Sequence, residues 1–159
     1  MSEDAKFEDG GEAPLALMVV DADDLQVVSA LVQDAVFPAS EMRWQKTQAR
    51  FALLLNRFRW EDVPSAKLRG RPVERVQTML IIDDVMRVQS QGVVAGDKDT
   101  VLSLLSVDFE PGEDGTGRVL LNLAGDGAIG LDVEALNITL KDVTRPYKAM
   151  SGKAPHHSL

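Results

Sequence analysis

Residues 100–143 constrain the fold most, because apolar runs of strand length follow one another there with only glycine-rich or acidic interruptions. In residues 101–109, apolar and polar positions alternate toward Pro111, as they do in a half-buried strand. The segment 112–117 contains three glycines, which permit the positive φ angles of a tight reversal. The pattern predicts a hairpin whose second strand covers residues 118–123.

The next apolar stretch changes phase partway along. Its apolar residues are odd-numbered in 129–133 and even-numbered in 136–140, with Ala135 between the two sets. The change predicts either a β-bulge or a bend between two sheets, since both keep the two apolar sets facing one core.

Gly125, Gly127 and Gly130 spell GxGxxG directly after an apolar run, which is the opening of a dinucleotide-binding fingerprint. The segment after these glycines is rich in β-branched residues and is therefore a poor helix. The chain leaves no room for a second parallel strand, and no acidic residue stands about twenty positions further on. We interpret the glycines as a hairpin turn and expect no cofactor.

The N-terminal part predicts a strand over residues 15–20 and then a helix. Asp21 is suited to cap that helix, because its carboxylate can accept hydrogen bonds from the free amides of the first turn. Apolar residues from 25 to 36 follow helical spacing, and Pro38 ends the helix after Phe37.

A second hairpin is predicted from alternating residues in 42–46 and 51–55. Phe58 and Trp60 then fall in the opposite phase, which predicts a bulge or bend near Arg57.

The middle of the chain mixes loops and strands. Prolines, a glycine and basic residues predict a flexible loop over 62–72. Strands are expected at 76–82 and 85–89 with a turn at 83–84 between them, and a loop is expected at 92–99.

These elements together predict an α+β domain. Its expected form is a curled antiparallel sheet or barrel-like roll of about seven strands, with one N-terminal helix packed on it. A pleckstrin-homology-like roll is one such arrangement, although residues 144–159 lack the apolar periodicity of its closing helix. The expected organisation is a disordered leader at 1–14, a single domain at 15–147 and a flexible tail at 148–159.

The 159-residue chain is 45% hydrophobic and 26% charged, which is ordinary for a globular protein. It has no cysteine, which excludes disulfides and thiolate chemistry. It has no apolar run long enough to span a membrane, and its acidic first residues do not resemble a secretory signal. We expect a cytoplasmic protein.

Charge is unevenly spread along the chain. The net charge is −8, yet residues 43–75 hold nine basic and three acidic residues, which leaves 8 basic and 22 acidic residues elsewhere. An acidic chain is a poor nucleic-acid binder, but a local basic patch can hold an acidic partner. Two interpretations stay open: the basic segment pairs with the acidic remainder, or it forms a binding surface.

Alternation places the arginines of this basic segment on the strand face opposite to the neighbouring aromatic residues, toward solvent. The candidate binding residues are Arg57, Arg59, Arg69 and Arg71, where a strand end meets the expected loop.

Catalytic and metal sites find little support in the sequence. The two histidines, His156 and His157, lie in a polar tail, so a nucleophilic triad has no base. Asp97 and Asp99 begin like a calcium loop, but apolar residues follow where ligands are needed. We expect neither catalytic nor metal-binding residues.

Two carboxylate pairs have the spacing of glycosidase acids, Asp108 with Glu110 and Asp132 with Glu134. Both pairs alternate with apolar residues, so we expect them on a solvated sheet face.

Four stretches carry a resemblance to a known family: TVLSLLSVDFEP (Thr100 to Pro111), GDGAIGLDVEALNITLKDV (Gly125 to Val143), RPY (Arg145 to Tyr147) and RFRWE (Arg57 to Glu61). The chain resembles, over nearly its whole length, a small bacterial family known only as a domain of unknown function. These are packing motifs, so the resemblance implies no activity and no site residues.

The function we favour is a non-catalytic protein-binding or adaptor module, with another protein as partner and without nucleic acid or membrane. Self-association through a sheet edge is a further option. The alternative is a small-molecule carrier or minor enzyme with its site inside the curled sheet. That alternative needs polar inward side chains, whereas the inward sets are apolar.

Overall fold

The computed structural model of the chain describes residues 14–93 and 100–148. The expected leader and tail therefore lie almost wholly outside the described residues, as does most of the 92–99 loop. The candidate ligands His156, His157, Asp97 and Asp99 lie outside them as well.

The described part is mainly antiparallel sheet with short helices. Its strands are β1 (Ala16–Val19), β2 (Ala35–Pro38), β3 (Met42–Gln45), β4 (Arg50–Phe58), β5 (Glu74–Ile82), β6 (Val85–Gln91), β7 (Val101–Pro111), β8 (Gly117–Leu123), β9 (Ala128–Val133), β10 (Ile138–Asp142) and β11 (Tyr147–Lys148). Its helices are α2 (Ala22–Leu31) and α3 (Val63–Leu68), with 3₁₀ turns η1 (Ala39–Glu41), η2 (Lys46–Gln48), η3 (Trp60–Asp62) and η4 (Glu113–Gly115).

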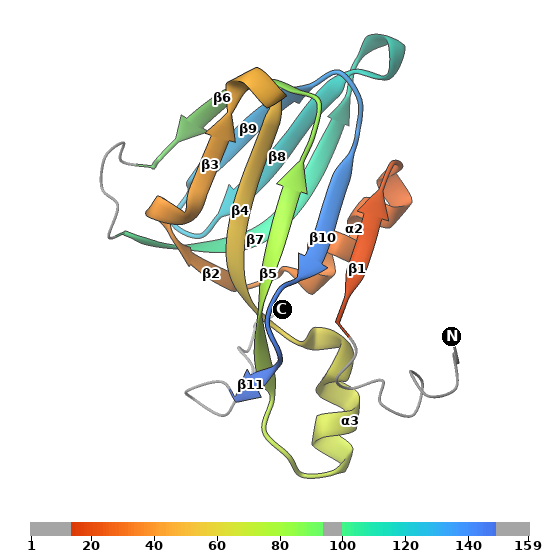
Figure 1. The fold of residues 1–159 in the computed structure, drawn as a ribbon, viewed down its shortest axis with the longest axis vertical. Helices are drawn as coiled ribbons and strands as arrows, with labels where there is room; N and C mark the ends of the chain where they lie inside the picture. Colours follow the sequence, from red (N-terminus) through yellow and green to blue (C-terminus); the bar gives the residue numbers. More distant parts are fainter. Residues whose placement is uncertain (1–13, 94–99, 149–159) are drawn as a thin grey trace.

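The strands form one curled sheet in the order β1-β10-β5-β4-β2-β7-β8-β9-β6, with β3 beside β4 and β11 beside β5 (Figure 1). The sheet is not closed into a barrel, because β1 and β6 each pair on one side only. Eleven strands are present in the described ranges, more than the expected seven or so.

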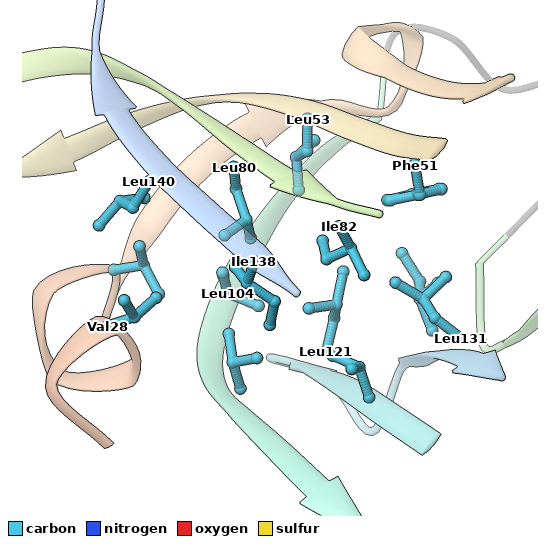
Figure 2. Close-up of a cluster of buried hydrophobic side chains, with 14 of the residues drawn as sticks. Val28, Phe51, Leu53, Leu80, Ile82, Leu104, Leu121, Leu131, Ile138 and Leu140 are labelled. Carbon is cyan, nitrogen blue, oxygen red and sulfur yellow. The ribbon is translucent and has the colours of Figure 1, made fainter. Parts of the chain in front are cut away.

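The curled sheet encloses an apolar core. Figure 2 shows side chains from β4, β5, β7, β8, β9 and β10 pointing toward one another, with Val28 of α2 beside them. Leu53, Leu80 and Leu121 are each fully buried. Alternation along each strand produces this arrangement, because every second side chain faces the interior.

Both predicted hairpins are confirmed, and so is the glycine turn before β9. β3 pairs with β4 and β7 pairs with β8. The GxGxxG segment forms the turn between β8 and β9, where Gly125 and Asp126 have positive φ angles, so no helix begins at these glycines. Neither option at Ala135 is correct as predicted: residues 134–137 interrupt the strand, and β9 pairs with β8 and β6 whereas β10 pairs with β5 and β1 of the same sheet.

The N-terminal helix is shorter than predicted. Asp21 caps it as expected, accepting from the Asp24 amide at 2.9 Å. The helix ends at Leu31, and residues 35–38 form strand β2 beside β7. Asp34 reverses the chain with φ of 64°, a conformation that aspartate tolerates, and the alternation of buried Ala35 and Phe37 then fits the sheet.

The predicted loop over 62–72 is also wrong, because most of it is helical. Helix α3 begins at Val63, and Pro64 lies in its first turn. Proline is compatible with the first turn of a helix, where its missing amide hydrogen costs no intrahelical bond. Here proline marks a helix start rather than a loop.

Candidate functional site

Arg57 lies near the end of β4 and is fully buried. The pairing of β4 with β5 runs from Phe51 to Phe58 without a register shift. Because side chains alternate along an unbroken strand, Arg57 shares the inward face with Leu53 and Leu55. The bulge predicted near Arg57 is wrong, the bend given as its alternative stays a prediction, and the arginine is turned toward the interior.

Acceptors surround the guanidinium of Arg57. Nη1 and Nη2 donate to the two carboxylate oxygens of Glu61 at 2.8 and 2.9 Å. Nη2 also donates to both oxygens of Asp142 at 3.1 Å. Nε donates to Oγ1 of Thr78 at 3.1 Å, and Nη1 to the Phe58 carbonyl at 3.0 Å. Every N–H of the guanidinium therefore has an acceptor, and none is left for a ligand.

We name Arg57, Glu61, Thr78 and Asp142 the Arg57 cluster. It links segments that are far apart in the sequence, because Thr78 belongs to β5 and Asp142 to β10. Thr78 Oγ1 donates to Asp142 at 2.7 Å, and the Leu15 amide donates to the other oxygen of Asp142 at 2.9 Å. The cluster thus fixes one end of the roll.

Both partners of the Arg57–Glu61 pair stay charged in the fold. Burial opposes the charge of Arg57, but the bonds and charges of Glu61 and Asp142 outweigh it and raise the pKa of Arg57 above its ordinary value. Burial likewise opposes the charge of Glu61, yet the bond and charge of Arg57 hold the pKa of Glu61 below its usual value.

A second cluster consists of Arg59, Asp62, Arg71 and Glu74. Arg59 donates to Asp62 at 3.3 Å and also to Glu74. Arg71 donates to both oxygens of Asp62. The Arg71 bond, joined by the charge of Arg59, lowers the pKa of Asp62 below its usual value, although burial acts in the other direction. We name this the Arg59 cluster.

The two clusters hold residues 60–73, here named the arm, which comprise η3, α3 and the turn into β5. The arm extends beyond the lower end of β4 and β5, away from the rest of the sheet (Figure 1). Trp60 Nε1 donates to the Gln33 carbonyl at 2.8 Å, and Ala66 of α3 is buried. The Trp60 bond fixes the start of the arm to the roll.

The four predicted binding arginines all lie around the base and end of the arm. Arg57 and Arg59 are buried at 0% and 3% exposure, and the Arg71 side chain is one-third exposed and paired with Asp62. Arg69 is exposed, and its charge is one of those that lower the pKa of Asp62. The binding role of the four arginines stays a prediction.

The end of α3 carries Lys67, Leu68 and Arg69, here named the arm tip. Leu68 is 87% exposed, the most exposed large hydrophobic side chain in the described part of the chain. Lys67 and Arg69 are also exposed, on either side of it in the sequence. A leucine in this position adds nothing to the core.

The described ranges include the two carboxylate pairs considered as candidate acids. No group of three or more His, Cys, Asp or Glu side chains there is placed to hold a metal. The predicted carboxylate pairs are on the outer face: Asp108 accepts from Asn122 at 2.7 Å, and Asp132 pairs with Arg118 at 2.8 Å. Among the same residues, no helix has both the length and the apolar character needed to cross a membrane.

Sequence reasoning missed Glu61, Thr78 and Asp142, although a signal was present. Thr78 is in phase with the inward residues of β5, and Asp142 is in phase with those of β10. Arg57 holds the matching inward position on β4. Three polar residues in the inward phase of three apolar strands indicate a buried polar cluster.

The fold and the two clusters define a mainly antiparallel sheet domain with a projecting helical arm fixed by buried ion pairs. The chain belongs to the family described as "Protein of unknown function (DUF2948)", whose model matches residues 15–157. No curated protein and no solved structure matches the chain.

Proposed function

We propose that this protein is a non-catalytic protein-binding module and that the arm is its contact surface. The observation that carries the proposal is the arm tip, where an 87% exposed leucine stands between two cations on a helix fixed at its base. Burying Leu68 in an apolar pocket of a partner removes its apolar surface from water, and the two cations can then face acidic groups at the border of that pocket. A partner with an apolar pocket and acidic border fits this chemistry.

The buried clusters support this role because they fix the arm before any partner arrives. An interface segment that is already ordered loses less conformational entropy on binding than a mobile one. In this proposal Arg57, Arg59 and Arg71 position the arm, whereas Arg69 contacts the partner. The four predicted arginines thus divide into two roles.

Affinity capture from native lysate tests the proposal. We expect Leu68→Asp and Arg69→Glu each to lose the partners that the unaltered protein retains. Met86→Asp is the matched control, because Met86 is a 54% exposed hydrophobic residue of β6, away from the arm. If Leu68→Asp folds normally and keeps every partner, the arm is not the contact surface.

Two further expectations belong to this proposal. We propose a cytoplasmic location, which suits a chain without cysteine. A pleckstrin-homology-like arrangement of the strands likewise stays a prediction. Cell fractionation tests the first.

A further inference from the structure

A groove of about 720 Å³ opens where the end of β1, the β7–β8 hairpin and the segment 135–137 meet. Most of its lining is apolar, and its larger apolar side chains are Met18, Val20, Phe109, Pro111 and Leu136. Met18 and Val20 are 70% and 67% exposed. The groove is large enough for several side chains of another molecule.

The charged side chains that line the groove are acidic. Asp21 and Asp84 line it, and no lysine or arginine does. Glu113, Asp114 and Glu134 are exposed and adjoin lining residues in the sequence. Apolar walls with an acidic border favour an occupant that presents an apolar side chain between positive charges.

The arm tip has that composition, with Leu68 between Lys67 and Arg69. We propose that the groove binds the arm tip of a second copy of this chain, an inference that rests on the proposed role of the arm. In the proposed contact Leu68 enters the apolar groove, while Lys67 and Arg69 face the acidic border.

The two surfaces are at opposite ends of the molecule. The β7–β8 hairpin lies at the upper end in Figure 1, and α3 lies at the lower end. One copy can therefore offer its arm to one neighbour and its groove to another. Such a head-to-tail contact is heterologous and produces either a closed ring or an open chain of copies.

Two substitutions separate the two halves of the contact. Leu68→Asp blocks the arm and leaves the groove intact. Val20→Arg blocks the groove and leaves the arm intact, and Val20 is exposed, so the fold tolerates the change. Met86→Asp serves as the control, because Met86 lines neither surface, although it lies two residues from Asp84 of the groove. Circular dichroism confirms the fold of each variant.

Sedimentation velocity over a concentration series gives the readout. We expect the unaltered protein and Met86→Asp to form larger species as concentration rises, and salt to weaken this association. Each blocking variant alone should associate at least about tenfold more weakly. An equimolar mixture of the two variants should stop at a dimer, because each supplies the one surface that the other lacks.

Three results would overturn the inference: a monomer at every concentration, oligomers that both blocking variants retain, or a mixture of variants that stays monomeric. The lysate experiment separates this failure from that of the proposed function. If self-association is absent but Leu68→Asp still loses a captured partner, the arm binds another protein and only the inference fails. If both are absent, both proposals fail.

Discussion

Three strands, β4, β5 and β10, contribute both to the apolar interior of the roll and to its charged end. In the interior, these strands present side chains such as Leu53, Leu80 and Leu140, which pack without directional contacts. At the charged end, the last inward positions of β4 and β10 hold Arg57 and Asp142, whose contacts have fixed geometry. The interior stabilises the fold through non-directional apolar packing, whereas the directional bonds of the charged end determine where the chain leaves the sheet.

The difference follows from what each region must hold. Apolar packing tolerates small shifts between neighbouring side chains of similar volume. A bidentate pair such as Arg57 with Glu61 allows only a narrow range of positions, and Glu61 belongs to the first turn of the arm. The Arg57–Asp142 pair is buried on both sides, and buried ion pairs are weak evidence for stability, so we infer that Arg57 serves to position these segments.

The largest effect is expected from Arg57→Met. Removing the guanidinium leaves Asp142 buried without its counter-charge, which costs about 3–5 kcal/mol in the free energy of unfolding. Adding Asp142→Asn neutralises the stranded carboxylate and keeps an acceptor for the Leu15 amide, so we expect the double variant to recover at least about 1 kcal/mol. Urea unfolding measures both.

A loss of under about 1 kcal/mol in the free energy of unfolding for Arg57→Met would contradict this contrast between the two regions. The charged end would then contribute no more than an exposed ion pair. A double variant no more stable than Arg57→Met would show that the loss comes from packing rather than from a stranded charge.

Leu80→Ala is expected to cost about 2–5 kcal/mol, because it removes buried methyl groups and leaves a cavity among closely packed neighbours. Leu80 is fully buried at the centre of the interior. In contrast to Arg57→Met, its loss should hardly change with pH. Unfolding curves at neutral and acidic pH check this, and a strongly pH-dependent loss would contradict the separation of the two regions.

Period-two alternation was sufficient for the interior and for the hairpins. Leu53, Leu80 and Leu121 are inward in their strands without any long-range information. The glycine turn before β9 also followed from local chemistry, because Gly125 occupies a positive-φ position that other residues rarely adopt. These are features that a few neighbouring residues determine.

The inward position of Arg57 could not be predicted from hydropathy, because a polar residue at an inward position of a strand interrupts the apolar alternation. A predicted bulge or bend near Arg57 would turn the arginine outward. In the structure Arg57 stays inward and donates to Asp142, which is 85 residues away in the sequence. The predicted end of the N-terminal helix is wrong for a related reason. The spacing of Ala35 and Phe37 fits a helix or a strand, and these residues form a strand because they pair with β7. Contacts at long sequence separation fixed both outcomes.

Acid should weaken the charged end before it weakens the interior. The pKa values of Glu61 and Asp62 are lowered in the fold, from ordinary values of 4.5 and 3.8. Their contribution to stability is therefore fully present above those ordinary values and is lost as the pH falls through the lowered ones. The free energy of unfolding should decline below about pH 4.5.

Asp62→Asn provides the control for this pH dependence. The free energies of unfolding of the unaltered protein and of Asp62→Asn should differ at neutral pH, because the variant lacks the Asp62 carboxylate. The two values should converge as the medium becomes acidic and this carboxylate is protonated in the unaltered protein. Urea unfolding at about pH 7 and about pH 3 measures the two differences. A difference that stays constant across this range would place the acid sensitivity in other carboxylates.

The smallest effect is expected from Arg50→Ala, which removes an ion pair outside both regions. Arg50 donates to Asp83 at 2.7 Å, but its side chain is 46% exposed, so water replaces the lost contact. Exposed pairs of this kind contribute about 0.2–1 kcal/mol to the free energy of unfolding, and salt reduces the contribution further. Urea unfolding at low and high salt measures it. If Arg50→Ala lowered the free energy of unfolding as much as Arg57→Met does, burial would not distinguish the charged end from an exposed ion pair. The inference that buried pairs fix the base of the arm would then be wrong.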